Sequence, residues 1–409
     1  MRANPRQLNG VKGLNCNLLT HPYGRQRLLL LIRHVEMKTL LRTAFFALFL
    51  FGTSSAIQAQ DLNRTFQASP DGKLVLDLET GGDIVIRGWN RNEASFSVNI
   101  TGRDADQVTV EFDESARTIE VFSEYKSRRA RADVNMEINV PARFNLDLST
   151  TGGDLNISGI TGRIEGSSMG GDLVLSQLGG RLDLSTMGGD IELTNSEVDG
   201  SLHTMGGDVT ITDVTGNING TTMGGDVQYK NVRSSRSGSK DEVKISSMGG
   251  DVNVDEALFG ADVSTMGGDI QIRKAGQYVK ATTMGGDIDV QELNGWIEAN
   301  TMGGDVVVNM VGGTEGDRHI ELSSMGGTIE VTVPRGLEMD IEIEIRLGDN
   351  DEEKYEIISD FDLNVEVEKN DDRRWRSSRE VVATGRTGSG KNHIKITTVN
   401  GDVILREGR

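Results

Sequence analysis

Acidic residues recur at a fixed spacing in the middle of the chain, and they are the side chains best placed to do chemistry. Each follows two glycines, and these Gly-Gly-Asp phrases end at Asp172, Asp190, Asp208, Asp226, Asp251, Asp269, Asp287 and Asp305. Carboxylates suit Ca²⁺, and calcium-binding β-repeats use a Gly-Gly-x-Gly-x-Asp pattern. This chain lacks the second glycine and aspartate, so its oxygen ligands are too few. We therefore favour a structural role over a calcium site: each aspartate accepts backbone N–H groups at its glycine turn.

A methionine stands three residues before each of these aspartates. The methionines are Met169, Met187, Met205 and Met223, eighteen residues apart, and then Met248, Met266, Met284 and Met302. Methionine fills irregular gaps and also adapts to binding partners. Two interpretations follow: a half-buried seal at a corner of the fold, which we favour, or a partner-binding stripe. Thr151 and Val399 occupy equivalent places, so the corner itself does not require methionine.

A phosphate-binding loop is the next candidate. Gly385 and the later Gly390-Lys391-Asn392 run have its glycine and lysine spacing. Asn392 stands where the motif needs the Ser or Thr that holds magnesium, and the following residues 393–397 read as a strand where the motif opens a helix. We expect a hairpin loop here instead.

The remaining candidates are isolated or charged side chains. His203, His319 and His393 lack metal-ligand spacing, so we expect a solvent-facing His203. Basic clusters at residues 128–131, 233–240 and 373–376 could hold anionic glycans or another subunit's aspartates, but ordinary loop charge is the simpler interpretation. Trp89, Trp296 and Trp375 are too scattered in the sequence for a sugar-stacking platform. The sequence therefore assigns no catalytic, cofactor-binding or metal-ligating residue.

The elements that must position these residues follow from the repeat itself. Apolar residues stand four and six places after each methionine, as in Val209 and Ile211, with polar residues between them. This alternation predicts a short strand with one buried face. A second glycine recurs eleven places after the methionine, as at Gly180 and Gly216, and we expect it to mark a second corner before a second strand. A fixed period of this kind predicts an all-β fold: a β-solenoid of 18-residue, two-strand rungs.

The ends of the chain repeat less strictly. We expect an N-terminal β cap at residues 60–150, regular repeats at 151–333 and a C-terminal β cap at 334–409. Expected strands in the caps lie at 74–78, 83–87, 96–100, 107–112, 118–122, 133–140, 338–346, 355–367 and 393–405. Residues 232–241 and 312–318 lengthen the period and are expected to protrude as loops without breaking the stack. Caps are needed because a stack exposes unpaired strand edges at both ends.

An export signal is predicted from Met37. Lys38 and Arg42 form its charged start, a short apolar run follows, and small residues lead to a cleavage site between Ala59 and Gln60. The apolar run is too short to span a bilayer as a mature helix. We expect a periplasmic, cell-surface or secreted protein.

Residues 1–36 are expected to be a non-native upstream extension. They contain Cys16, the only cysteine, so the mature chain would have no disulfide and no lipid-attachment cysteine. The whole chain of 409 residues has a formal charge of −19, and the part after residue 59 carries about −26. Such a charge argues against nucleic acid and anionic membrane surfaces as partners.

The repeats, the leader and the entry segment Asp83-Ile84-Val85-Ile86-Arg87-Gly88-Trp89 together resemble the bacterial putative-adhesin domain family. The resemblance runs from about Phe66 to Leu405. It implies an all-β, solenoid-like protein of the cell envelope with no established catalytic residue. The expected function is noncatalytic binding or scaffolding of an envelope or extracellular glycan or protein, with self-association as a further option. The alternative is a polysaccharide lyase or hydrolase on a β-helix, which would need basic, tyrosine and acidic residues focused on one face.

Overall fold

Strands make up almost all of the structure, a computed structural model that describes residues 61–233, 243–347, 355–370 and 378–409. These residues belong to one compact unit, Gln58–Arg409. The only helix among them is the short 3-10 helix η1 (Ala105–Gln107). The predicted all-β fold is therefore confirmed. The predicted leader and upstream extension, most of the 232–241 loop and the 373–376 cluster with Trp375 lie outside the described residues.

The strands fall into three groups along the chain. The first group is β1 (Leu62–Gln67), β2 (Gly72–Leu78), β3 (Ile84–Trp89), β4 (Glu93–Thr101), β5 (Val108–Ser115), β6 (Thr118–Tyr125), β7 (Asp133–Pro141), β8 (Phe144–Thr150) and β9 (Leu155–Ser158). The regular group is β10 (Thr161–Ser168), β11 (Leu173–Ser176), β12 (Gly179–Thr186), β13 (Ile191–Thr204), β14 (Val209–Thr215), β15 (Ile218–Thr221), β16 (Val227–Arg233), β17 (Val243–Ser246), β18 (Val252–Ala257), β19 (Ala261–Ser264), β20 (Ile270–Thr282), β21 (Ile288–Thr301), β22 (Val306–Met310), β23 (Ile320–Ser324) and β24 (Ile329–Val333). The last group is β25 (Met339–Leu347), β26 (Ile357–Ser359), β27 (Asn364–Asn370), β28 (Ser378–Thr387), β29 (Asn392–Val399) and β30 (Val403–Glu407).

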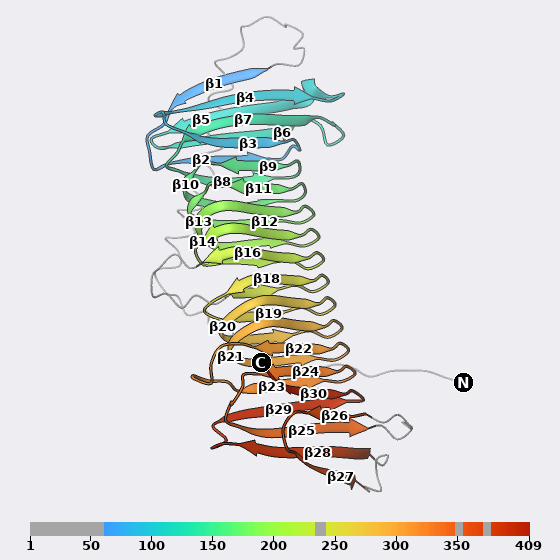
Figure 1. Cartoon of the computed structure of the whole chain (residues 1–409). Coiled ribbons are helices and arrows are strands. Elements are labelled where there is room, and N and C mark those ends of the chain that lie inside the picture. The colour runs from blue at the N-terminus through green and yellow to red at the C-terminus, as the bar shows by residue number, and fades with distance from the viewer. Residues whose placement is uncertain (1–60, 234–242, 348–354, 371–377) are drawn as a thin grey trace, which may run out of the picture. The chain divides into compact units, whose positions relative to one another are not determined.

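Successive repeats lie on one another as parallel strands in register (Figure 1). Val209, for example, pairs with Ile191 of the preceding repeat and with Val227 of the next. Each rung enters along one sheet, turns at its Gly-Gly-Asp phrase and returns along a second sheet. Equivalent apolar side chains therefore form buried columns between the sheets, and Ile270 and Ile288 are at most 1% exposed. No rung could hide its apolar face alone, so the stack is stabilised rung by rung.

The second corner involves more residues than the predicted glycine. In four regular rungs, the residues eight places after Met169, Met187, Met205 and Met223 turn the chain there: Gln177, Asn195, Asp213 and Asn231, with φ between 50° and 55°. Gln, Asn and Asp tolerate this left-handed conformation better than branched side chains. The predicted glycines three places later also have a positive φ, 100° at Gly180 and 140° at Gly216, and Gly216 is needed for a second reason. A Cβ on Gly216 would lie 1.9 Å from the Val198 carbonyl oxygen of the preceding rung, so only glycine allows the rungs to approach there.

The N-terminal rungs do not follow chain order. β2 pairs in parallel with both β6 and β8, and β3 pairs with both β7 and β9. The β2–β3 rung is therefore inserted between two rungs that come later in the sequence. Antiparallel strands close this end: β4 pairs with β7, β1 with β4, and β5 with β6.

At the C-terminal end a rung is also inserted out of chain order, and here it is the last rung of the chain. β29 lies between β23 and β25, and β30 lies between β24 and β26. The antiparallel strands β28 and β27 then follow β25. The single strands predicted at 355–367 and 393–405 are wrong, because each range contains two strands. In the second range, Asn400 turns the chain with a φ of 53°.

The two expected loops that the structure describes in full have different outcomes. The 385–392 connection is not a hairpin, because β28 and β29 pair with opposite edges of β25 and not with each other. The residues after Asn392 form a strand, as predicted. The 312–318 loop leaves the stack intact, as predicted, since β21 pairs with β23 and β22 with β24 across it.

Candidate functional site

The Gly-Gly-Asp turns of all rungs lie at one edge of the stack, which we call the turn edge. Inside this edge, the Thr or Ser before each methionine is buried, and Thr204 is fully buried. Its hydroxyl donates to the Gly189 carbonyl oxygen of the preceding rung at 2.8 Å and accepts the Gly207 N–H of its own turn at 3.3 Å. The same donation to the preceding rung recurs from Thr186 to Thr398 at 2.7–3.1 Å. A column of buried hydroxyls thus ties each turn to its neighbour.

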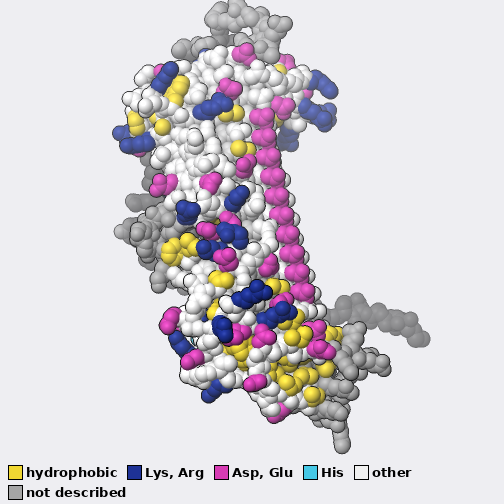
Figure 2. Space-filling model, viewed as in Figure 1, with side chains coloured by type: hydrophobic (Ala, Val, Ile, Leu, Met, Phe, Trp, Pro, Cys, Tyr) yellow, Lys and Arg dark blue, Asp and Glu magenta, His cyan; other side chains and the backbone are white. Residues whose placement is uncertain are grey.

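Outside the edge runs the aspartate column, which consists of Asp83, Asp154, Asp172, Asp190, Asp208, Asp226, Asp251, Asp269, Asp287 and Asp305. Oδ1 of each accepts the backbone N–H of the equivalent residue in the next rung, at 2.7–3.0 Å. The acceptor role predicted from the sequence is confirmed, although the N–H belongs to the next rung and not to the same turn. Figure 2 shows the column as a continuous line of acidic side chains.

The aspartate column combines a favourable contact with an unfavourable one. Each carboxylate gains a hydrogen bond, but neighbouring rungs hold their carboxylates about 4.8 Å apart, where like charges repel. We expect Asp208→Ala to lower the free energy of unfolding by about 0.5–1.5 kcal/mol, because the Asp226 N–H loses its acceptor. Asp208→Asn should stay close to wild type, since it keeps an acceptor oxygen and removes a charge. Urea unfolding followed by circular dichroism measures both, and equal losses in the two variants would contradict this account.

The methionine column comprises Met169, Met187, Met205, Met223, Met248, Met266, Met284, Met302 and Met325. These side chains lie at the corner, as predicted, and are 38–57% exposed. Each therefore covers part of its turn and presents the rest of its thioether chain to solvent. Each turn from Met169 to Asp305 carries one methionine and, three residues later, one aspartate, so both columns run along this edge.

Among the residues that the structure describes, the other acidic and histidine side chains form no focused centre. Within the described ranges, no group of three or more His, Cys, Asp or Glu side chains could hold a metal ion. His203 is exposed, as predicted, and its Nδ1 lies 2.7 Å from Thr221 Oγ1. His319 and His393, far apart in sequence, are neighbours, since His319 Nδ1 accepts the His393 backbone N–H at 2.9 Å. This contact joins the inserted last rung to the regular stack.

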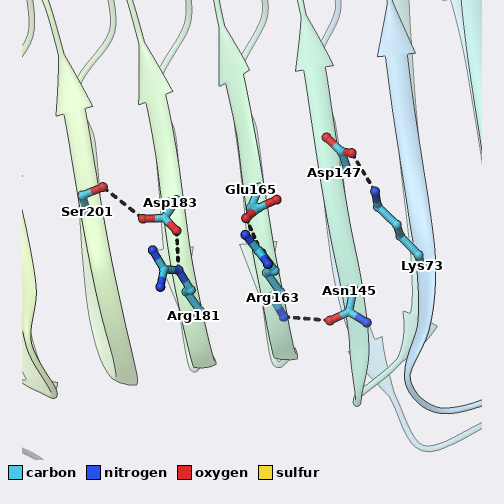
Figure 3. Close-up of polar contacts among 8 residues, drawn as sticks. All are labelled: Lys73, Asn145, Asp147, Arg163, Glu165, Arg181, Asp183 and Ser201. Carbon is cyan, nitrogen blue, oxygen red and sulfur yellow. Dashed lines mark hydrogen bonds and ion pairs between the residues drawn. The ribbon is translucent and has the colours of Figure 1, made fainter. Parts of the chain in front are cut away.

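The outward face near the N-terminal end carries ion pairs (Figure 3). Lys73 Nζ contacts Asp147 at 2.7 Å across neighbouring rungs, and Arg181 Nε contacts Asp183 at 2.7 Å within one strand. Partial burial acts to raise the pKa of Asp183, but hydrogen bonds from Arg181 and Ser201 outweigh it and hold that pKa below its ordinary value. Such exposed pairs contribute little to stability. They neutralise charge on this face, unlike the aspartate column.

Sequence reasoning missed one aromatic pair. Trp89 lies far from the other tryptophans in the sequence, and its Nε1–H donates to the Glu93 carbonyl oxygen at 2.8 Å. Trp296, however, stacks on Tyr278 of the preceding rung, with ring centroids 5.1 Å apart. The signal was available, because both residues stand twelve places after a methionine, in consecutive repeats.

Stacked parallel rungs, two sheets and a turn edge with aligned side chains define a β-solenoid. A family model matches residues 56–283, more than half of the chain, and the chain belongs to the Toastrack DUF4097 family. The resemblance stated from the sequence is thereby confirmed. The regular rungs continue beyond this match, to β24.

Three solved structures of bacterial proteins match the chain at low similarity. One is a putative adhesin from Parabacteroides merdae: 14% identity, 61% of this chain and 96% of that one, TM-score 0.34. Another is a putative lipid-binding protein from Parabacteroides distasonis, with 16% sequence identity, a match covering 66% of this chain and 96% of that one, and a TM-score of 0.28. A third is a putative adhesin from Bacteroides fragilis, with 13% sequence identity, a match covering 85% of this chain and 97% of that one, and a TM-score of 0.18. At these values they support no inference about function.

Two further findings concern curated relatives and membrane-spanning helices. No curated protein sequence matches the chain. Within the part that the structure describes, no helix is long and apolar enough to cross a bilayer.

Proposed function

We propose that the chain is an exported, noncatalytic, adhesin-like protein that binds or scaffolds a partner at the cell envelope. Export rests on the signal predicted before the Ala59–Gln60 cleavage site, and places the mature protein in the periplasm, on the cell surface or outside the cell. The partner is an envelope or extracellular protein or glycan. The charge of about −26 after residue 59 argues against nucleic acid as that partner.

The exposed methionine column is the observation that carries this proposal. Its members from Met169 to Met325 follow one another at about 4.8 Å per rung, which makes an apolar strip about 38 Å long. Thr151 stands at the same place in an earlier turn, so the fold does not need an apolar side chain there. A contiguous exposed apolar strip is typical of an interaction surface. Methionine suits such a surface because its flexible thioether chain adapts to a partner.

The neighbouring aspartate column narrows the chemistry of the partner. An elongated partner that lies along the turn edge meets an apolar strip beside a row of negative charges. The best fit is an extended segment that presents apolar and cationic groups together. Electrostatic attraction would speed its association, and this contribution should weaken as salt is raised.

Replacing part of the methionine column tests the proposal. In one variant, Met205, Met223, Met248, Met266 and Met284 become Thr. We expect the purified chain to bind isolated cell envelopes at least about tenfold more weakly, a loss of about 1.4 kcal/mol. Its melting temperature should stay within a few degrees of wild type, because exposed substitutions change stability little. Binding is measured by co-sedimentation of the labelled chain with envelopes.

A matched control carries the same number of changes on the same rungs. Thr210, Gln228, Asn253, Gln271 and Asp289 stand five places after those methionines, on the outward face of the first strand, and become Ser. This control should bind as the wild type does. Equal binding by the methionine variant and the wild type would exclude the turn edge as the binding surface.

A further inference from the structure

Two consecutive rungs depart from the repeat at the same position. Twelve places after the methionine, other rungs carry Arg181, Asp199 and Asn217, whereas these two carry Tyr278 and Trp296. The period is also lengthened by five residues between Met302 and Met325, directly after these rungs. In a repeat protein, deviations that gather at one place are not explained by the needs of the stack. They lie at the second corner, the opposite end of the rung from the turn edge.

A glycine of the preceding rung, Gly260, lies against Tyr278, the first ring of the aromatic pair. The two rings are nearly parallel, with an interplanar angle of 17°. Gly260 stands at their position in the preceding rung, and a Cβ there would lie 2.3 Å from Tyr278 Cε1. Gly260 therefore leaves room for the Tyr278 ring to lie against the backbone. Lys280 Nζ lies 5.8 Å from the centre of a Trp296 ring, so a cation also borders the pair.

The inserted loop at residues 312–318 is held in place beside the rings. Arg318 is only 3% exposed. Its guanidinium donates to the carbonyl oxygens of Glu315 and Val311 at 3.1 Å each, and to Asn294 Oδ1 at 2.5 Å. A buried arginine with several hydrogen bonds fastens the loop to the rung of Trp296. Burial lowers the pKa of Arg318.

Rings and loop together border a cavity of about 490 Å³ that is open to solvent on one side. Its lining runs over four successive rungs: Leu258, Gly276–Tyr278, Asn294–Trp296 and Glu315–Arg318. Four rungs span about 14 Å, so the cavity follows the stack. Its volume lies within the roughly 300–1,000 Å³ of small-molecule sites. Two amides, from Gln277 and Asn294, and two carboxylates, from Glu315 and Asp317, border the aromatic rings.

We propose that this cavity binds two or three units of a neutral glycan. A pyranose unit has apolar C–H groups that pack on aromatic rings, and hydroxyls that bond amides and carboxylates at its rim. Both kinds of group are present at this site. Arg318 is buried against its hydrogen-bond acceptors, and Lys280 is paired with Glu298 at 3.8 Å. The exposed carboxylates of Glu315 and Asp317 therefore face the ligand, disfavour anionic sugars and phosphates, and select an uncharged glycan. The site is separate from the methionine column, so it does not depend on the turn edge.

Calorimetric titration of the full chain with cellotriose, maltotriose and chitotriose tests the proposal. At least one should bind with a dissociation constant below about 1 mM, whereas trigalacturonate should bind at least about tenfold more weakly. Trp296→Asn should weaken the interaction at least about tenfold. This change returns the position to a residue that the repeat itself uses at Asn217, so the stack should still form. A second variant, Glu315→Gln with Asp317→Asn, should reduce the discrimination against trigalacturonate.

Two controls separate the site from the rest of the molecule. Arg181→Asn makes a matched change at the same repeat position of another rung and should leave binding unaltered. The variant with five methionines replaced should also bind the oligosaccharide normally, so failure of the turn-edge proposal would not be mistaken for failure here. Absence of binding by all three neutral oligosaccharides at about 10 mM, or equal binding by Trp296→Asn, would overturn the proposal.

Discussion

Gly189→Ala is expected to disrupt the stack, whereas Gly188→Ala should be tolerated. The two glycines are adjacent in one turn, but their surroundings differ. A Cβ on Gly189 would lie 1.9 Å from the Gly171 carbonyl oxygen and 2.7 Å from the Asp172 nitrogen of the preceding rung. A Cβ on Gly188 would meet nothing closer than the Gly170 Cα, at 4.0 Å. In this turn the second glycine is therefore required by the close approach of rungs, and the first is not.

The expected effect of Gly189→Ala exceeds that of ordinary overpacking. Extra carbon atoms in a core usually cost about 1–3 kcal/mol, because flexible side chains move aside. Here the obstacle is backbone that also carries the hydrogen bonds between rungs, so relief requires the rungs to separate. We expect a loss of at least about 3 kcal/mol for Gly189→Ala and less than about 1 kcal/mol for Gly188→Ala. Chemical unfolding of both variants gives the comparison, and equal stabilities would contradict the role assigned to the second glycine.

The regular part of the fold could be predicted because every rung carries its own copy of the signal. Val209 and Ile211 alternate with polar residues as Ile270 and Ile272 do, so many weak indications agree. The turn could be placed for the same reason. Its chemistry could be inferred only in part, because Asp208 bonds the next rung and not its own turn. A contact between rungs is invisible in a single repeat.

The order of the strands at the two ends could not be predicted because their pairing is non-local. Strands at 74–78 and 133–140 were found from local patterns, but nothing local shows that β2 lies between β6 and β8. The same holds for β29, because its Ile394 pairs with Ile320 of β23, which lies 74 residues earlier in the chain. Non-local order of this kind is fixed by competition among strand edges. The Tyr278–Trp296 pair was missed for a simpler reason: two different aromatic residues are recognised as neighbours only through their shared place in consecutive repeats.

Removal of the last rung is expected to have the second large effect, because that rung is an insert and not an end. A chain that stops after Lys391 lacks β29 and β30, including the fully buried Ile394, Ile396, Val403 and Leu405. Burial of each contributes about 1.5–3 kcal/mol, a sum comparable with the whole stability of a domain. Loss of a terminal repeat normally removes one interface, but here β23 and β25 both lose a parallel partner.

The truncated chain should therefore expose new strand edges and associate. Unpaired edges with apolar faces join other chains, so size-exclusion chromatography should show oligomers or aggregates, with a lower melting temperature. A chain that stops after Glu407 keeps both strands and loses only Gly408 and Arg409; it should remain like the wild type. A monomeric truncated chain that melts normally would mean that β25 can close onto β23 without the insert. The inserted rung would then be dispensable, and the change of strand order at this end would have no role in stability.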